Sequence, residues 1–231
     1  MELEFYGATG EVTGSCHILH IGGRQVLLEC GLVQGGRQQQ ARNREDFPFD
    51  PRKLDAVVLS HAHIDHSGRL PLLVQRGFAG PIYAQSATAD FCKIMLEDSA
   101  RLAEGDAETE NRKRDRKDLP HVTPLYTLAD VERTLRQLVP LPYEKKREIL
   151  PGISICFQDA GHILGSAQVR VAHGGETWVA GGDYKSDPDP TCAPFEAVSC
   201  DTFITEATFG LPIYRWPPQA EVFAAINAWW R

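Results

Sequence analysis

Short runs of apolar residues bounded by glycines and prolines recur along the chain and predict β-strands. The clearest run is 54–60, in which Asp55 is the only charged residue, as expected of a strand buried on both faces. Gly22-Gly23 and Gly174-Gly175 each lie between two such runs and predict hairpin turns. The other expected strands are 2–6, 15–21, 25–30, 81–84, 153–158, 167–172, 177–181 and 204–206.

Apolar residues at helical spacing predict helices in three middle segments, 67–77, 86–118 and 127–139. Thr127 can cap the last of them, and Pro140 and Pro142 follow it. After residue 103 the second segment continues with charges of both signs, which is typical of a solvated helix or exposed arm. A basic clamp for nucleic acid is the less favoured interpretation there. With a short helix at 38–45 and another beginning near Gln219, the elements indicate an α/β fold.

Composition is that of an ordinary globular domain, with 231 residues, 42% of them hydrophobic and 24% charged. No eighteen apolar residues follow one another, and no basic stretch precedes an apolar run at the start. We therefore expect a cytoplasmic location and no membrane partner. Six scattered cysteines form no C-x-x-C pair, so we expect reduced and mostly buried thiols.

The net charge of −7 mildly disfavours a nucleic-acid partner, because phosphate binding usually draws on clustered lysines and arginines. Two bound divalent cations would offset four of those charges, leaving about −3, and would concentrate positive potential in their own cleft. Charge therefore does not decide between nucleic acid and other substrates.

Three histidines and a carboxylate follow the strand predicted at 54–60: His61, His63, Asp65 and His66. Strand ends are where open sheets place their chemistry. Neutral imidazole suits zinc, and a carboxylate can cap or bridge two close dications. His61 and His63 can aim at one point, while Asp65 and His66 continue round the turn towards a second. Two adjacent ions fit this order better than one.

Two further candidate ligands, His162 and Asp183, lie next to glycines at predicted strand ends. Glycine lets the backbone bend a side chain inward without steric cost. We expect His162 to join His61 and His63 on the first ion and Asp183 to bridge both ions. The remaining histidines are interpreted as structural or surface residues: His17, His20, His121 and His173.

The stretch His61-Ala62-His63-Ile64-Asp65-His66 resembles the metal-binding signature of the metallo-β-lactamase fold hydrolases. The resemblance implies an αβ/βα sandwich of which the chain holds the N-terminal part. It further implies a metallo-β-lactamase domain at 1–208, with a helical insertion at about 86–145, and the start of a truncated β-CASP domain at 209–231. Motifs similar to the β-CASP group of RNA-processing nucleases in this superfamily lie at 98–100, 106–108, 111–112, 124–127, 159–167 and 206–210.

Two other stretches, 183–195 and 209–216, look more like the bacterial ligase-associated DNA exonucleases of the superfamily, so RNA and DNA both stay open. The chain departs from the family at Glu29, where the family usually has Asp. The resemblance implies that this residue supports the ligands rather than binding metal. It also implies that the last histidine ligand of the second ion, and the histidine thought to protonate the leaving group, would follow residue 231.

We therefore expect a metal-dependent phosphodiester hydrolase that processes RNA through a hydroxide held between two zinc ions. Asp183 would bridge the ions, Asp65 would also orient the hydroxide, and Glu206, in the first β-CASP motif, completes the expected catalytic residues. Single-stranded RNA or DNA is the expected partner, and a homodimer is left open. The alternatives are a DNA exonuclease of the ligase-associated type, a small ester or thioester hydrolase, and a non-catalytic scaffold subunit.

Overall fold

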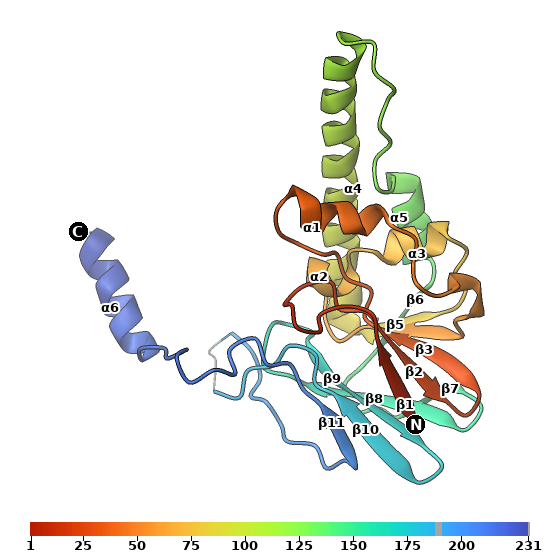
Figure 1. The fold of residues 1–231 in the computed structure, drawn as a ribbon. Helices are drawn as coiled ribbons and strands as arrows, with labels where there is room; N and C mark the ends of the chain where they lie inside the picture. Colours follow the sequence, from red (N-terminus) through yellow and green to blue (C-terminus); the bar gives the residue numbers. More distant parts are fainter. Residues whose placement is uncertain (188–190, 231) are drawn as a thin grey trace.

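Two β-sheets form the body of the computed structural model, which describes residues 1–187 and 191–230 (Figure 1). The first sheet has the order β1-β2-β3-β4-β5-β6 and the second the order β11-β10-β9-β8-β7. The strands of the first sheet are β1 (Glu2–Phe5), β2 (His17–Ile21), β3 (Arg24–Leu28), β4 (Ala56–Val58), β5 (Ile82–Gln85) and β6 (Leu138–Leu141). Those of the second are β7 (Arg147–Leu150), β8 (Ile153–Asp159), β9 (Ala167–His173), β10 (Glu176–Ala180) and β11 (Thr202–Ile204).

Strand direction changes part-way across the first sheet. β1, β2 and β3 pair antiparallel, whereas β3 to β6 pair parallel. The second sheet is antiparallel except for β11, which runs parallel to β10. Parallel strands bring their carboxyl ends to one edge of a sheet, so the residues that follow β4 lie where such sheets place their chemistry.

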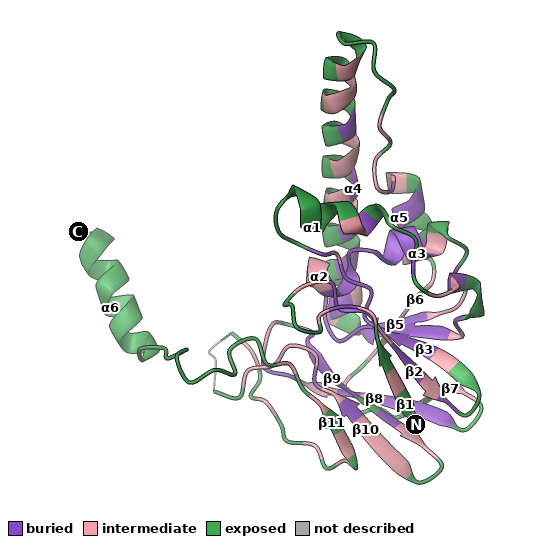
Figure 2. Ribbon diagram, viewed as in Figure 1, coloured by how far each residue is buried: buried purple, intermediate pink, exposed green. Residues whose placement is uncertain are grey.

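The core lies in two layers, one on each face of the first sheet (Figure 2). On one face Val57 packs with Leu72 of α3 (Leu70–Gln75) and Leu96 of α4 (Ser86–Asp115). On the other face Val58 packs with Phe157 of the second sheet. Successive strand residues point to opposite faces of the sheet, and both faces are covered here. This explains why most residues of 54–60 are apolar. The order helix layer, sheet, sheet confirms the predicted α/β sandwich.

The predicted helix at 127–139 is wrong at its end. Helix α5 (Leu128–Leu135) is closed at its start by a capping box between Thr127 and Asp130, but residues 138–141 form β6 beside β5. Pro140 is compatible with this strand because β6 lies at the edge of the sheet. The region expected as a helical insertion therefore also contributes a strand. Strand β7 was not predicted; it is a short edge strand with charged residues.

The turn expected after His63 is also wrong, because Asp65 and His66 lie in the short helix α2 (Ile64–Ser67). Helix α3 then begins at Leu70 within the helix predicted at 67–77. The short helix predicted at 38–45 corresponds to α1 (Arg37–Ala41) and the 3-10 turn η1 (Arg42–Arg44), and a second 3-10 turn, η2 (Pro51–Lys53), precedes β4. β11 begins earlier than expected and ends at Ile204, so Glu206 follows a strand, as expected of the acidic residue in its motif.

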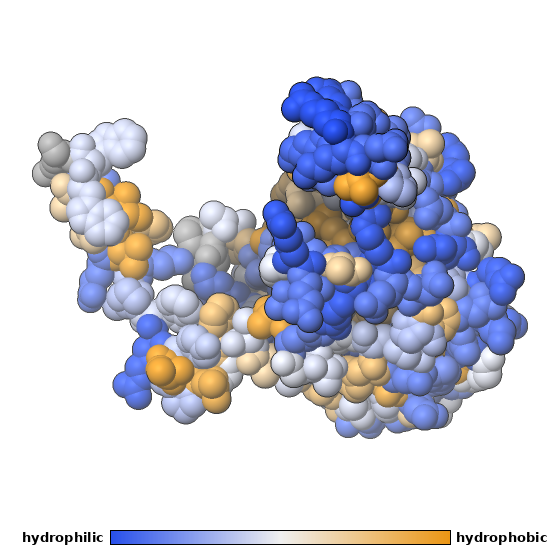
Figure 3. Space-filling model, turned by 45° about the horizontal axis from the view of Figure 1, so that its top comes forward, coloured by the Kyte–Doolittle hydropathy of each residue, from blue (hydrophilic) through white to orange (hydrophobic). Residues whose placement is uncertain are grey.

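Two helices extend away from the body (Figure 1). The outer half of α4 projects from the sheets, and α6 (Gln219–Trp230) has no buried residue (Figure 2). The exposed apolar side chains of α6 include Val222, Phe223 and Ile226 (Figure 3). No described helix is both long and apolar enough to cross a membrane. Residues 188–190, inside the stretch likened to DNA exonucleases, and Arg231 lie outside the described residues.

Candidate metal centre

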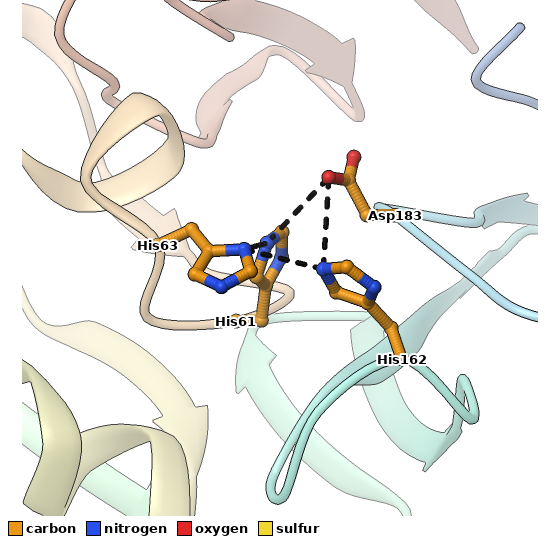
Figure 4. Close-up of side chains that lie close together, drawn as sticks. All are labelled: His61, His63, His162 and Asp183. Carbon is orange, nitrogen blue, oxygen red and sulfur yellow. Dashed lines mark hydrogen bonds and ion pairs between the residues drawn. The ribbon is translucent and has the colours of Figure 1, made fainter. Parts of the chain in front are cut away.

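Three histidines and one carboxylate converge between the ends of the two sheets (Figure 4). The His61 Nε2 atom lies 3.0 Å from His63 Nδ1, and His162 Nε2 lies 3.2 Å from the same His63 nitrogen. Asp183 Oδ2 is 3.8 Å from both His61 Nε2 and His162 Nε2. One ligand atom from each of the four residues falls within 4.8 Å of the others. The structure thus brings together the set expected around the first ion.

The backbone around this set is locally specialised. Gly161 and Gly182, which precede His162 and Asp183, have φ of 68° and 58°, in the left-handed region that favours glycine. A Cβ on Gly182 would lie 2.5 Å from the Ser60 Cβ, so no larger residue fits between the two sheets here. The amide of Ala167 donates to the Ser60 carbonyl at 2.8 Å and joins the sheets directly. His61 is fully buried at this junction.

A second group of donors gathers around His66. Its Nε2 atom is 3.3 Å from Asp183 Oδ1 and 3.9 Å from Asp65 Oδ2. The two oxygens of Asp183 therefore face different groups, Oδ2 towards His61 and His162 and Oδ1 towards His66, as a bridging carboxylate requires. Asp65 belongs to neither of the compact donor groups, which are His61, His63, His162 and Asp183 in one case and Glu29, His61 and His66 in the other.

Glu29 contacts His66 on the side of the ring that faces away from Asp183. Its Oε1 accepts from the Ser60 amide at 2.6 Å and its Oε2 lies 2.9 Å from His66 Nδ1. The φ of Glu29 is 63°, an uncommon conformation for a residue with a side chain, and such strain clusters at functional sites. The contacts agree with the supporting role that the sequence suggested, since Glu29 touches the histidine ring on the side away from Asp183.

Burial and neighbouring charge set the protonation of the histidines. Burial lowers the pKa of His61 well below its ordinary value, and burial also lowers the pKa of His162. Burial opposes the charge on His66 as well, but hydrogen bonds to Asp183 and Glu29 raise its pKa to about 10. Despite its own burial, Asp183 has a lowered pKa because of His66. The neutral rings of His61 and His162 and the ionised Asp183 are the forms that bind metal, whereas His66 has to lose its proton when an ion binds.

Sequence reasoning missed two residues of this region. The Ser60 Oγ lies 2.9 Å from His61 Nδ1, so it turns the other ring nitrogen of His61 towards the centre. His17, which we expected to be merely structural or on the surface, lines a cleft of about 510 Å³ together with His66, Asp183 and Glu206. Glu206 accepts from the Thr208 amide at 2.9 Å and is half-buried. The position of Ser60 directly before His61 was the only sequence signal of its role. No neighbouring residue in the sequence indicated that His17 lines the cleft.

The donor set of three imidazoles and a carboxylate fits a divalent transition metal, because zinc is usually held by such nitrogen and oxygen atoms. The family model of the metallo-beta-lactamase superfamily matches residues 9–184, a range that includes every expected metal ligand. The chain belongs to the metallo-beta-lactamase superfamily. Its H-x-H-x-D-H stretch, His162 and Asp183 are thus the candidate metal ligands of a superfamily member.

Curated relatives of this superfamily chain share its sequence over most of its length. Ribonuclease TTHA0252 of Thermus thermophilus is 39% identical over 215 residues, which are 91% of this chain and 44% of that protein. Transcription termination factor FttA of Methanosarcina mazei is 33% identical, over 88% of this chain and 31% of its own. Integrator complex subunit 11 of Danio rerio is 31% identical, over 90% of this chain and 34% of its own. The chain spans less than half the length of these relatives.

Proposed function

We propose that this chain carries the metal centre of a β-CASP type nuclease that hydrolyses phosphodiester bonds in RNA. The observation that carries the proposal is the convergence of His61, His63, His162 and Asp183 between the two sheets. The names of relatives support RNA as the polymer, since one is a ribonuclease and another a transcription termination factor. The cytoplasmic location and the homodimer left open by the sequence stay predictions.

The proposed ligands divide between two zinc ions. His61, His63 and His162 would hold the first ion and Asp65 with His66 the second, and Asp183 would bridge them. Two ions bound here would lower the pKa of a water molecule and offset the charge of the attacked phosphate. Asp65, with its carboxylate 3.9 Å from His66 Nε2, lies at the edge of the donor set, where it would orient that water.

Glu206 would act beside the second ion. It lines the cleft with His66 and Asp183 and favours the charged form of His162 through its own charge. A carboxylate at this place can orient a substrate hydroxyl or a water molecule. The division of the chain at residue 208 is also part of the proposal, and its support is that residues 207–230 are all exposed.

The experiment compares cleavage of single-stranded RNA and DNA of equal sequence, alongside metal content measured by mass spectrometry. We expect about two zinc ions, cleavage of RNA, and loss of both cleavage and one ion in His63→Ala. The matched control is His173→Ala, because His173 contacts the Gly152 carbonyl at the end of β9 opposite to Ala167, the residue that joins the sheets beside the centre. Cleavage of DNA alone would favour the ligase-associated exonuclease. If neither polymer is cleaved but a thioester is hydrolysed, the chain is a small ester or thioester hydrolase and the nuclease proposal is wrong.

A further inference from the structure

One wall of the cleft beside His66 has no part in the proposed hydrolysis: the aromatic pair of Phe5 and His17. Phe5 ends β1 and His17 begins β2, and the antiparallel register places the two directly opposite each other. Their ring centroids are 5.0 Å apart with the planes at 66°, an edge-to-face contact. Because directly opposed residues share a face of the sheet, both rings stand on the side that turns towards the second sheet.

Phe5 presents a large apolar ring to the cleft. It is 51% exposed, in the edge strand β1, which has no buried residue. A phenyl ring left half in water at the wall of a cleft gains free energy when a flat apolar surface covers it. The ring is already held in place by His17, so little conformational freedom is lost when a ligand stacks on it.

His17 supports Phe5 and adds no charge. Burial lowers the pKa of His17 to about 4, which leaves the ring neutral near pH 7. Its Nδ1 atom is buried and makes no hydrogen bond of good geometry within the described residues. The Cys16 carbonyl, which favours the charged form of His17, already accepts from the Tyr6 amide at 2.8 Å. The uncharged ring therefore packs edge-to-face against Phe5.

The charged residues of the cleft indicate which kind of ligand can bind next to Phe5 and His17. Four carboxylates line the described cleft, Glu11, Glu29, Asp183 and Glu206, and no lysine or arginine is among the lining residues. Asp183, Glu29 and Glu206 lie at the metal centre, and Glu11 is paired with Arg42 at 2.7 Å, so the described wall at Phe5 and His17 offers a neutral ring no unpaired cation. The volume of about 510 Å³ is within the range of sites that hold small organic groups.

We propose that Phe5 and His17 form a stacking site for one nucleobase of the bound strand, next to the phosphate that is cleaved. Phe5 contacts the base and His17 positions the Phe5 ring. The site rests on the proposed nuclease function and adds to it the recognition of a nucleotide that flanks the reaction. Every base has a flat aromatic face, so this contact contributes affinity without sequence preference.

The test places the fluorescent adenine analogue 2-aminopurine at successive positions of a short strand of whichever polymer the wild type cleaves. Stacking quenches its emission, which is followed by stopped flow before cleavage. We expect quenching at one position near the cleaved bond, and its loss in Phe5→Ala. We also expect KM to rise at least about 5-fold with kcat unchanged, since stacking on an aromatic residue is worth about 1 kcal/mol or more. Phe5→Tyr keeps a flat ring and should behave as wild type.

Two controls separate stacking from damage to the fold. Phe91→Ala removes an exposed aromatic of α4 that does not line the cleft, and it should leave quenching and KM unchanged. A substrate that lacks the base at the quenched position should give wild type and Phe5→Ala the same KM. Equal quenching and equal KM with the complete substrate would overturn the stacking site while cleavage by the wild type upholds the nuclease. A wild type that neither binds nor cleaves RNA or DNA would overturn both.

Discussion

Asp183 lies between two sets of donors that are built differently, one of His61, His63 and His162 and the other around His66. The first takes His61 and His63 from the end of β4 and His162 from the loop between β8 and β9, so the packing of both sheets holds it. The second depends on one imidazole, that of His66 in a four-residue helix, and on Glu29 in a strained conformation behind it. Three converging nitrogens bind a zinc ion more firmly than one nitrogen with carboxylates. We therefore expect two ions of unequal affinity.

The largest expected effect comes from removing a ligand of the first group. His162→Ala should lower the cleavage rate at least about 100-fold and release the first ion, because changes even outside the ligand set cost about 10- to 100-fold. His162 lies half-buried in a loop, so the fold should survive. The measurement is single-turnover cleavage with zinc content. His121→Ala, which removes an exposed histidine paired with Asp115, should change neither. Full zinc content in His162→Ala would show that His162 is not a ligand of the more firmly bound ion.

A smaller and more selective effect is expected from Glu29→Gln. The substitution keeps the size of the side chain but removes the charge that faces His66 Nδ1 at 2.9 Å. Affinity at the second position should fall about 10- to 100-fold while the first ion stays bound. Zinc titration with a competing chelator measures both affinities. Glu148→Gln, at a carboxylate in the exposed edge strand β7, is the control. Loss of the first ion together with the second would show that the groups are not independent.

Metal removal should also reduce stability, by an amount set by affinity. An ion present at 100 times its dissociation constant stabilises the folded state by about 2.7 kcal/mol. We expect urea unfolding with and without chelator to differ by about this amount for the wild type. In His162→Ala the difference should be much smaller, because only the weaker position remains. An equal difference in both proteins would contradict the inequality of the two groups.

The smallest effect concerns a residue remote from both groups. Asp130 caps α5 by accepting from the Thr127 amide at 2.8 Å and also pairs with Arg133. Burial opposes its ionisation, but the Thr127 and Arg133 contacts lower its pKa below the ordinary 3.8. The ionised cap therefore stabilises the fold fully above about pH 4, and this contribution is lost as the pH falls through the lowered pKa. Asp130→Asn should lower the free energy of unfolding by about 1 kcal/mol at pH 7.

The difference between Asp130→Asn and wild type should shrink as the pH falls below 4, and zinc content should be unchanged at pH 7. Chemical unfolding across this pH range measures the difference in free energy of unfolding, and mass spectrometry measures the zinc content. A difference that is constant with pH would exclude the charge of Asp130 as the cause.

The first donor group was largely predictable from the sequence because each ligand carries a local signal. His61 and His63 follow a fully apolar strand, and His162 and Asp183 follow glycines, which have positive φ in the structure. The helical position of His66 was not predicted, since four residues are too few for a periodic pattern. β6 was missed because Leu135 and Leu138 continue the helical spacing of α5, and only pairing with β5 decides for a strand.

The cleft was beyond sequence reasoning for a different reason. Phe5 and His17 are twelve residues apart, and only the register of β1 and β2 makes them neighbours. The cleft also needs Glu206, which follows a strand of the other sheet. Contacts across strands and between sheets depend on the topology, which local patterns of apolar residues do not specify.

The most direct test of the central claim is an equilibrium zinc titration of the metal-free wild type, followed by mass spectrometry at each step. The expected result is two binding steps separated by at least about tenfold in affinity, the tighter lost in His162→Ala and the weaker in Glu29→Gln. A single step, or no zinc bound at concentrations that saturate a competing chelator, would contradict the two unequal positions on which the proposed nuclease rests.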